Sequence, residues 1–127
     1  MQITMLANTK ILAFYETIKN QKLSMKTAYK LAQLNKAAQE ENNFFQEKLQ
    51  TIIAEYGEIN EAGQPIPTED GRGIKLKPGT EPDCYTAMQE LYELEVALPD
   101  ILFDIEEFSN VELSADEIGA IIPFIKD

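Results

Sequence analysis

The residues that could carry chemistry in this chain are mainly carboxylates. The sequence holds 22 Asp and Glu against 11 Lys and Arg, with one cysteine and no histidine. Histidine is the commonest general base and metal ligand, and its absence excludes Ser-His and Cys-His nucleophile pairs. A zinc site would need several carboxylates around the single Cys84, which is an unusual ligand set. We therefore predict no catalytic, metal-ligating or cofactor-binding residues, no cofactor, and a protein that is not an enzyme.

One segment comes close to a metal-binding motif. Residues 58–69 resemble a calcium loop, because Gly63 and Glu69 stand at its sixth and twelfth positions. The fifth position, however, is Ala62, which cannot ligate a metal, and Pro65 is incompatible with the usual loop backbone. We expect no calcium site here.

Charge is segregated along the chain. Residues 1–39 carry six lysines and one acid, whereas residues 78–127 carry thirteen acids and one base, a local net charge of −12 within a total of −11. Either the acids keep the protein soluble and the two halves attract each other, or the acidic half is a surface for a basic partner. Direct binding to nucleic acid is disfavoured because it needs a basic patch. A basic, nucleic-acid-binding protein is the favoured partner.

The candidate interface residues follow from this distribution. Five acids of the acidic half are candidates for contacting a basic protein. Three lysines, spaced at i, i+4 and i+8 on one helix face, form a ridge that is either a solvated face or a docking surface for an anionic partner. The candidates are Asp100, Asp104, Glu106, Glu107, Glu112, Lys22, Lys26 and Lys30.

One long amphipathic helix organises the predicted fold. Residues 24–56 hold no Gly or Pro, and apolar residues recur there at helical spacing. Ser24 is expected to cap its start and Gly57 to end it. Its polar middle, residues 39–43, is where a kink or break would fall.

The segment before this helix predicts its partner in a helical hairpin. Residues 2–6 alternate in polarity and form either a short edge strand or a lead-in. Asn8 is the expected N-cap of a helix that ends near Asn20. The short connection from there to Ser24 predicts antiparallel packing of the two helices.

After the long helix the composition changes. Residues 58–79 hold four of the six glycines and three of the six prolines, and predict a β-hairpin or an irregular arm around a turn at residues 69–71. A third helix is expected to open at Thr80 and to end before Pro99. Cys84 and Val96 lie on its apolar stripe, so Cys84 is read as a core residue and not as a reactive thiol.

The last part of the chain predicts one strand and one helix. Residues 100–106 alternate, with Ile101, Phe103 and Ile105 on one face, which is a strand pattern. Ser114 and Glu117 form a capping box that starts a short C-terminal helix.

Together these elements predict an α+β, mainly helical fold. It comprises an N-terminal antiparallel helical hairpin with one long helix, a β-hairpin or arm, a third helix, a short strand and a short capped C-terminal helix. We expect a single domain over residues 1–127, with the helical hairpin at 1–57, the arm at 58–79 and an acidic helix-strand-helix part at 80–127.

The sequence also predicts a cellular location. Its start, MQITM, lacks the basic residues and apolar run of a signal peptide. No stretch approaches the roughly 20 apolar residues of a membrane span. A single cysteine fits a reducing compartment. We expect a cytoplasmic protein with no membrane partner.

Several segments resemble a known family. They are residues 23–32 (LSMKTAYKLA), 53–58 (IAEYGE), 60–63 (NEAG), 105–108 (IEEF) and 111–118 (VELSADEI). In this order they are similar to an uncharacterised family of small acidic proteins encoded by phages and prophages of Gram-positive bacteria. The matching motifs are helix starts, helix ends and turns, so the resemblance transfers no functional residue. It implies a phage or prophage origin, action in the bacterial cytoplasm and a non-enzymatic role.

Two functions remain open at this point. The first is an accessory protein that binds and inhibits or modulates a basic host protein, such as a defence nuclease. The second is a chaperone or scaffold for a tail or head component during virion assembly, for which exposed apolar positions along the long helix would matter more than charge. Self-association through the long helix, giving a homo-oligomer, fits either function.

Overall fold

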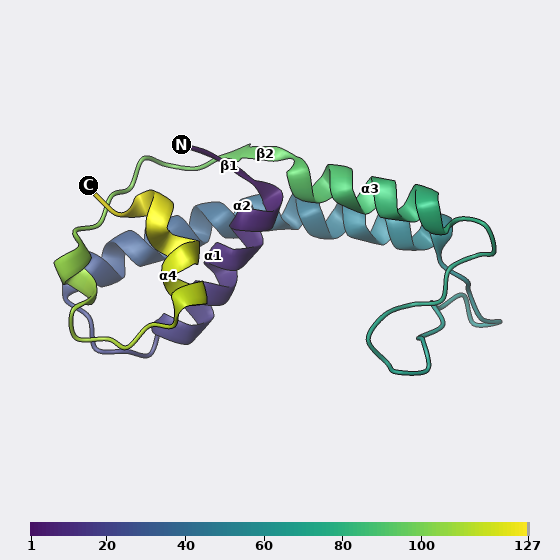
Figure 1. Cartoon of the computed structure of the whole chain (residues 1–127), viewed down its shortest axis with the longest axis horizontal. Helices are drawn as coiled ribbons and strands as arrows, with labels where there is room; N and C mark the ends of the chain where they lie inside the picture. Colours follow the sequence, from purple (N-terminus) through teal and green to yellow (C-terminus); the bar gives the residue numbers. More distant parts are fainter. Residues whose placement is uncertain (127) are drawn as a thin grey trace. The chain divides into compact units, whose positions relative to one another are not determined.

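The computed structural model describes residues 1–126 and has a mainly helical α+β fold. The two strands form an antiparallel sheet, and the remaining elements are helical. In chain order the elements are β1 (Gln2–Thr4), α1 (Met5–Ile18), α2 (Met25–Tyr56), α3 (Glu81–Glu93), β2 (Glu95–Ala97), the 3₁₀ helix η1 (Ile105–Phe108), α4 (Ala115–Ile121) and the 3₁₀ helix η2 (Ile122–Phe124). Figure 1 shows these elements along the chain.

The chain divides into two compact units. The first unit contains residues 1–42 together with the described residues from 95 onward, and the second unit contains residues 43–94. These limits differ from the predicted divisions after residues 57 and 79. The first unit contains both the N-terminal and the C-terminal part of the chain, whereas the predicted divisions assigned these two parts to different regions.

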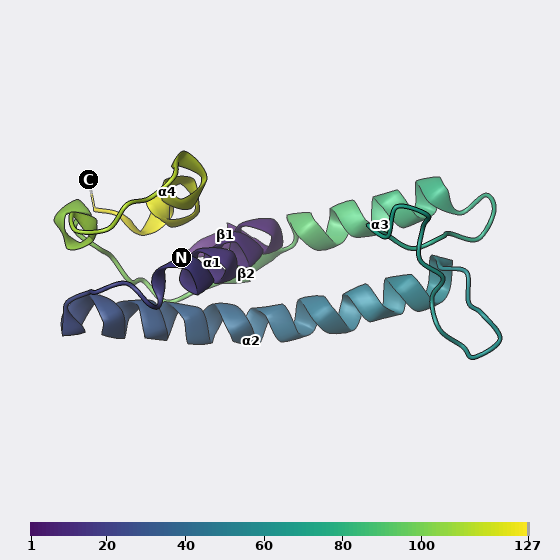
Figure 2. The same cartoon turned by 90° about the horizontal axis from the view of Figure 1, so that it is seen from below.

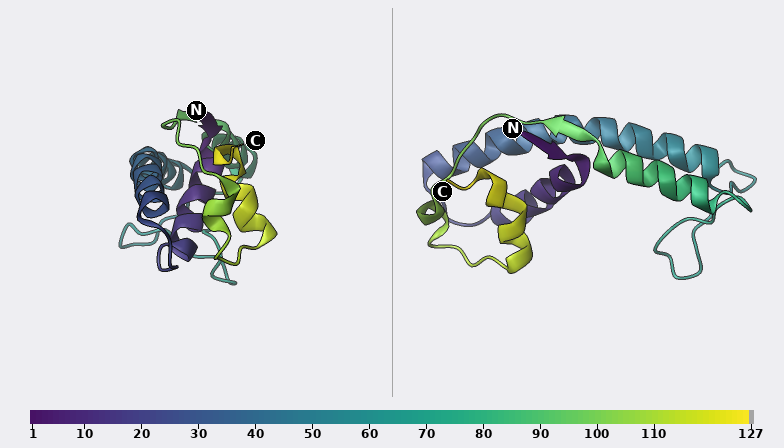
Figure 3. Two further views of the ribbon diagram at one scale, coloured as in Figure 1. Left: turned by 90° about the vertical axis from the view of Figure 1, so that its left-hand side faces the viewer. Right: turned by 45° about the horizontal axis from the view of Figure 1, so that its top comes forward.

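The sheet of the first unit is formed by the start of the chain and by the segment after α3. Ile3 pairs with Val96 in antiparallel register, and Figure 3 shows β1 and β2 side by side. Two predictions are therefore wrong. Val96 is buried in a strand and not in the third helix, and the strand lies at residues 95–97 and not at residues 100–106. Val96 alternates with two exposed neighbours, which suits a short half-buried strand.

Helix α1 begins earlier than predicted. Its N-cap is Thr4, whose side-chain oxygen accepts a hydrogen bond from the Ala7 N–H at 3.2 Å. Asn8, the predicted cap, is fully buried inside the helix, and its Nδ2 donates to the Ala38 carbonyl of α2 at 2.9 Å. Pairing of β1 with β2 fixes the chain up to Thr4, so the helix starts where the strand ends.

Helix α2 is one continuous helix, as Figure 2 shows, and the polar middle does not break it. The predicted ends are confirmed. Ser24 Oγ accepts from the Thr27 N–H at 3.2 Å, and the helix stops one residue before Gly57. Gly57 is required there, because an added Cβ would lie 2.6 Å from the Ile53 carbonyl oxygen. The connection from α1, residues 19–24, is as short as the predicted helical hairpin needs.

The core of the first unit is built from α1, the first part of α2 and the C-terminal segment. Phe108 is its aromatic centre, with ring centroids 6.2 Å from Phe14 and 5.3 Å from Phe103. Such edge and tilted aromatic pairs add to the stabilisation from burial. The buried residues of this cluster are Ile11, Phe14, Ile18, Leu31, Leu34, Ala38, Leu98, Phe103, Phe108, Ile121 and Phe124.

The second unit contains the end of α2, the arm and α3. Helix α3 runs back alongside the last part of α2 (Figure 1), and Phe45 packs on Tyr92 with ring centroids 5.4 Å apart. The helix starts after Thr80, as predicted, but ends at Glu93, so Pro99 does not mark its end. Cys84 is half-buried on this helix.

The arm, residues 57–79, is held by isolated bridges and not by regular strands. Three backbone N–H groups form a closed ring of hydrogen bonds: Glu58 donates to Lys75, Lys75 donates to Ile66, and Ile66 donates to Glu58, at 2.8, 2.8 and 3.1 Å. Pro67 pairs with Ile74 across the predicted turn. The pairing around the turn is therefore confirmed, while prolines and glycines keep it irregular.

Candidate functional site

The best candidate site is a groove on the C-terminal segment of the first unit. Its walls are η1, the loop that follows it, α4 and η2, and its volume is about 520 Å³. Volumes of this size are typical of binding pockets. The lining residues are Ile105, Glu106, Phe108, Ser109, Val111, Leu113, Ile118, Ile121, Ile122 and Ile125. Nearly all of them are apolar, so the floor of the groove is hydrophobic.

Local sequence signals shape one wall of this groove. Ser114 caps α4, because its side chain accepts from the Glu117 N–H at 3.2 Å while Glu117 accepts from the Ser114 N–H at 3.1 Å. This confirms the predicted capping box. Pro123 then lies within the short 3₁₀ turn η2 that follows α4. Helix α4 and η2 together therefore form a short helical segment, and its isoleucines line the groove.

Three large apolar side chains at the groove are left uncovered. Ile105 is 70% exposed, Ile122 is 59% exposed and Ile118 is 45% exposed. Single exposed apolar residues are ordinary, but several around one hollow indicate a surface for an apolar partner. The alternation of residues 100–106 predicted a strand with Ile105 on the same face as Ile101 and Phe103. Ile105 is exposed because residues 105–108 form a 3₁₀ helix, which turns this side chain outward.

One of the candidate interface acids lines this groove, and a second is close to it in the sequence. Glu106 is exposed and belongs to the lining, whereas Glu112 is exposed and lies in the chain between the lining residues Val111 and Leu113 without being part of the lining. Within residues 1–126, neither carboxylate has a cation within 4 Å. The groove therefore combines a hydrophobic floor with one unpaired carboxylate, that of Glu106, at its rim.

A third candidate acid, Glu107, faces the opposite way. Its carboxylate accepts from the Thr27 hydroxyl at 2.8 Å, from Lys30 Nζ at 3.1 Å and from the Asp104 N–H at 2.7 Å. Burial alone would raise the pKa of Glu107, but these hydrogen bonds and the Lys30 charge outweigh it, so the pKa lies below its ordinary value. Glu107 thus anchors η1 to α2 and is not offered to a partner.

The other two candidate acids are also paired within the first unit. Asp100 accepts from the N-terminal ammonium of Met1 at 2.9 Å, and this hydrogen bond lowers its pKa. Asp104 lies 3.7 Å from Lys126 Nζ. Both pairs are well exposed, so each contributes little to stability. Of the five candidate acids, Glu106 and Glu112 are therefore the two without a cation partner among the described residues, and Glu106 is the one that lines the groove.

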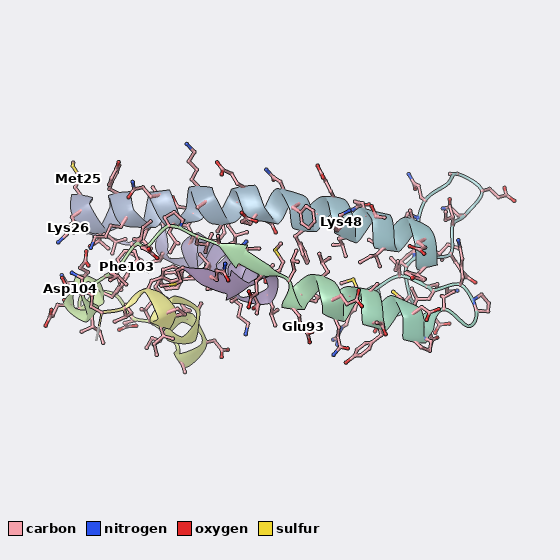
Figure 4. All side chains as sticks on the ribbon, turned by 90° about the horizontal axis from the view of Figure 1, so that it is seen from above. Met25, Lys26, Lys48, Glu93, Phe103 and Asp104 are labelled. Carbon is pink, nitrogen blue, oxygen red and sulfur yellow. The ribbon has the colours of Figure 1, made fainter. Side chains whose placement is uncertain are left out.

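The candidate lysines do not act as one ridge. Lys30 turns inward, where its Nζ donates to the Leu102 carbonyl at 2.8 Å and lies 5.3 Å from the centroid of the Phe103 ring. Lys22 and Lys26 are exposed. Figure 4 shows Met25 on the opposite side of α2 from Phe103 and Asp104. The exposed start of α2 is therefore a surface separate from the inner side of the C-terminal segment.

Another hollow of the first unit is less suited to a partner. It lies between α1 and α4, has a volume of about 500 Å³ and is lined in part by Lys10, Thr17 and Glu117. The Thr17 hydroxyl donates to Glu117 at 3.1 Å across it. Two of its polar side chains, Thr17 and Glu117, therefore bind each other, and its lining holds fewer large apolar side chains than the groove of the C-terminal segment.

The groove has the chemistry of a binding site. Its lining offers one carboxylate and one hydroxyl, Glu106 and Ser109, among apolar side chains. Within the described part of the chain, no group of three or more Cys, Asp or Glu converges as metal ligands would. Among residues 1–126, no helix combines the length and the apolar character that crossing a membrane requires.

Sequence reasoning missed the apolar side of the site. The isoleucines from Ile118 to Ile125 were visible, but their spacing alone does not tell which of them are covered. The signal that could have found them is the high density of isoleucine in a helix too short to bury all of its faces. Comparisons of the chain with protein-family models, with curated protein sequences and with solved structures give no match.

Proposed function

We propose that this protein is a non-enzymatic protein-binding protein of phage or prophage origin that inhibits or modulates a basic host protein. A defence nuclease is the kind of target that fits, because enzymes that handle nucleic acid carry basic surfaces. The single observation that supports this proposal is the apolar groove whose lining includes the unpaired Glu106. The action would take place in the host cytoplasm and would serve host takeover or defence evasion.

Charge and groove have separate tasks in this proposal. The net charge of −11 would attract a basic protein over distance and raise the rate of encounter. The exposed isoleucines would then supply the buried apolar contact that slows dissociation. A complex formed in this way weakens as salt rises, because salt screens the charges outside the buried contact.

The test is affinity purification from phage-infected host cells, followed by mass spectrometry of the retained proteins. The bait is the wild-type protein, and the matched control bait carries Glu106→Gln and Glu112→Gln. We expect a basic protein that the wild type retains more strongly than the control does. Its purified complex should weaken steeply between about 0.05 M and about 0.5 M salt. Retention of acidic proteins alone, or a complex insensitive to salt, would remove the basis of the proposal.

The alternative function is a chaperone or scaffold in virion assembly. The observation that favours it is the row of exposed apolar side chains along α2, where Met25 is 88% exposed, Tyr29 65% and Phe44 41%. Such side chains would contact an apolar partner or a second copy of the chain. Gene neighbourhood separates the two functions: adjacent structural genes favour assembly, and adjacent early or accessory genes favour inhibition.

A further inference from the structure

We propose that the groove of the C-terminal segment binds a short amphipathic α-helix that carries lysine or arginine beside its apolar face. The inference rests on the proposed function and specifies the segment of the basic partner that enters the site. It is carried by two features of the groove together, the uncovered isoleucines and the unpaired Glu106 carboxylate in the same lining.

The backbone of the groove favours a helix over an extended peptide. Strand addition needs a sheet edge with free N–H and C=O groups. Here the walls are helical, and the one bridge beside them is closed, since the Phe103 N–H donates to Phe124 at 2.7 Å and the Lys126 N–H donates to Phe103 at 2.8 Å. Polyproline segments select grooves lined by aromatic rings, but Phe108 is the one aromatic residue of this lining. Aliphatic side chains on one face of a helix fit such a groove best.

The rim determines the charge of the helix. Glu106 and Glu112 have no cation within 4 Å in the described part of the chain, and Lys126, the nearest base in sequence, lies 3.7 Å from Asp104. A bound lysine or arginine would therefore find an unpaired carboxylate without breaking an ion pair. Anionic lipid is disfavoured for the same reason, because its headgroups would meet the Glu106 carboxylate.

The occupant is a segment of another protein and not a second groove. Two grooves facing each other would bring like charges together, which costs free energy. Lys22, Met25 and Lys26, in the loop before α2 and in its first turn, are each exposed, and a part of this segment could enter the groove of a second copy. That arrangement is an outcome of the test described next, and it would overturn the proposal.

The test uses synthetic helical peptides of about 14 residues, roughly four helical turns. The first probe carries leucine on one face and lysine on its flanks. The second has glutamate in place of lysine, and the third has the composition of the first in a scrambled order without an apolar face. Binding to the full chain is measured by fluorescence anisotropy. We expect the first probe to bind at least about tenfold more tightly than either of the others, which corresponds to about 1.4 kcal/mol.

Matched variants locate the binding. Ile105→Lys places a positive charge in the groove, and its control, Met25→Lys, makes the same change at an exposed residue outside it. We expect Ile105→Lys to lower the affinity of the chain for the first probe by about tenfold or more. The control, Met25→Lys, should lower it by less than about twofold. The double change Glu106→Gln with Glu112→Gln should lower the affinity for the first probe by about threefold to tenfold at low salt. Its control, Glu40→Gln with Glu95→Gln, should leave this affinity unchanged.

The results separate this inference from the proposed function. If a basic protein binds the chain and Ile105→Lys leaves its affinity unchanged, the groove inference is wrong and the proposed function stands. If the peptide binds the groove and no basic protein is retained from cells, the proposed function is wrong. Equal binding of the three probes, or sedimentation showing self-association that Ile105→Lys and Met25→Lys both abolish, would overturn the helix-binding groove. Circular dichroism checks that every variant keeps its helix content.

Discussion

Glu106 and Glu107 are neighbours in the chain, yet they lie on opposite sides of the C-terminal segment. Glu107 belongs to the inner side, where Thr27, Lys30 and the Asp104 N–H satisfy its carboxylate. Glu106 belongs to the outer side, where it lines an apolar groove without a cation. Net charge therefore does not show which acids are available to a partner. Glu107 holds the fold together, whereas Glu106 stays unpaired at the groove.

Apolar residues of the same segment divide in the same way. Phe103 is fully buried, while its neighbour Leu102 is 42% exposed, and Ile121 is 1% exposed, while Ile122 is 59% exposed. The inner residues fill the core of the first unit. The outer ones keep apolar surface in contact with water, which is unfavourable unless a partner covers it. The segment therefore has one side that is buried in the core and one side that stays exposed, and the exposed side is the one that we propose for recognition.

The largest expected loss of stability comes from truncating a buried side chain on the inner side of the C-terminal segment. Phe103→Ala removes a fully buried ring that packs on Phe108 and lies under the Lys30 ammonium. We expect it to lower the free energy of unfolding by about 3–5 kcal/mol in urea denaturation. Leu102→Ala, the neighbouring change on the outer side, should cost less than about 1.5 kcal/mol. Equal losses would show that the two sides do not differ.

Removing the Glu107 carboxylate, which binds Lys30 and Thr27, should give the next largest loss of stability. Glu107→Ala leaves the Lys30 ammonium, whose side chain is 18% exposed, without its carboxylate. We expect a loss of about 2–3 kcal/mol in the free energy of unfolding, because a mostly buried charge is left unpaired. Glu106→Ala is the control and should change it by less than about 0.5 kcal/mol. Adding Lys30→Met to Glu107→Ala should recover part of the loss.

The same carboxylate makes stability depend on pH. The folded-state pKa of Glu107 is lowered from 4.5, so the unfolded chain binds the proton more readily. Its contribution is therefore complete above about pH 4.5 and is lost as the pH falls through the lowered folded value. Urea unfolding between about pH 7 and pH 3 should show this loss in the wild type, and a smaller one in Glu107→Gln. A parallel decline in both proteins would assign the effect to other acids.

A smaller effect is expected at the start of α4. Ser114→Ala removes the side-chain acceptor for the Glu117 N–H and half of the capping box. We expect a loss of about 1 kcal/mol in the free energy of unfolding. The change should also loosen one wall of the groove and modestly lower the affinity for the leucine–lysine helical peptide. Ser109→Ala is the matched control, because this serine belongs to the same lining and caps the end of η1 through its backbone N–H, which the change keeps. If it costs as much, the cap is not the cause.

Local signals predicted the helices well and the strands poorly. The start of α2 at Ser24, its end at Gly57 and the capping box at Ser114 depend on hydrogen bonds and backbone space within a few residues, so the sequence displays them directly. The strand at residues 95–97 depends on pairing with residues 2–4 at the other end of the chain. Alternation at residues 100–106 reflects inner and outer positions of a loop and a 3₁₀ turn, a pattern that resembles a strand.

The candidate site was predictable in part. The acidic character of the C-terminal half named Glu106, which lines the groove, and Glu112, which is exposed and unpaired, together with Asp100, Asp104 and Glu107, which have partners inside the first unit. Sequence cannot separate these two groups, because the partners come from distant positions in the chain. The exposure of three isoleucines was likewise hidden, since it depends on how far a short helix is covered by the rest of the unit.

The most direct measurement is a peptide titration of the isotopically labelled full chain followed by amide NMR. The probe is the leucine–lysine helical peptide, and the scrambled peptide is the reference. We predict that the largest changes in amide chemical shift fall within residues 105–125, around the lining of the groove. The amide signals of Glu107 and its partner Thr27 should change little. Changes centred on the exposed start of α2 or on α3, or spread evenly over all acidic residues, would contradict the claim that the outer side of the C-terminal segment is the binding surface.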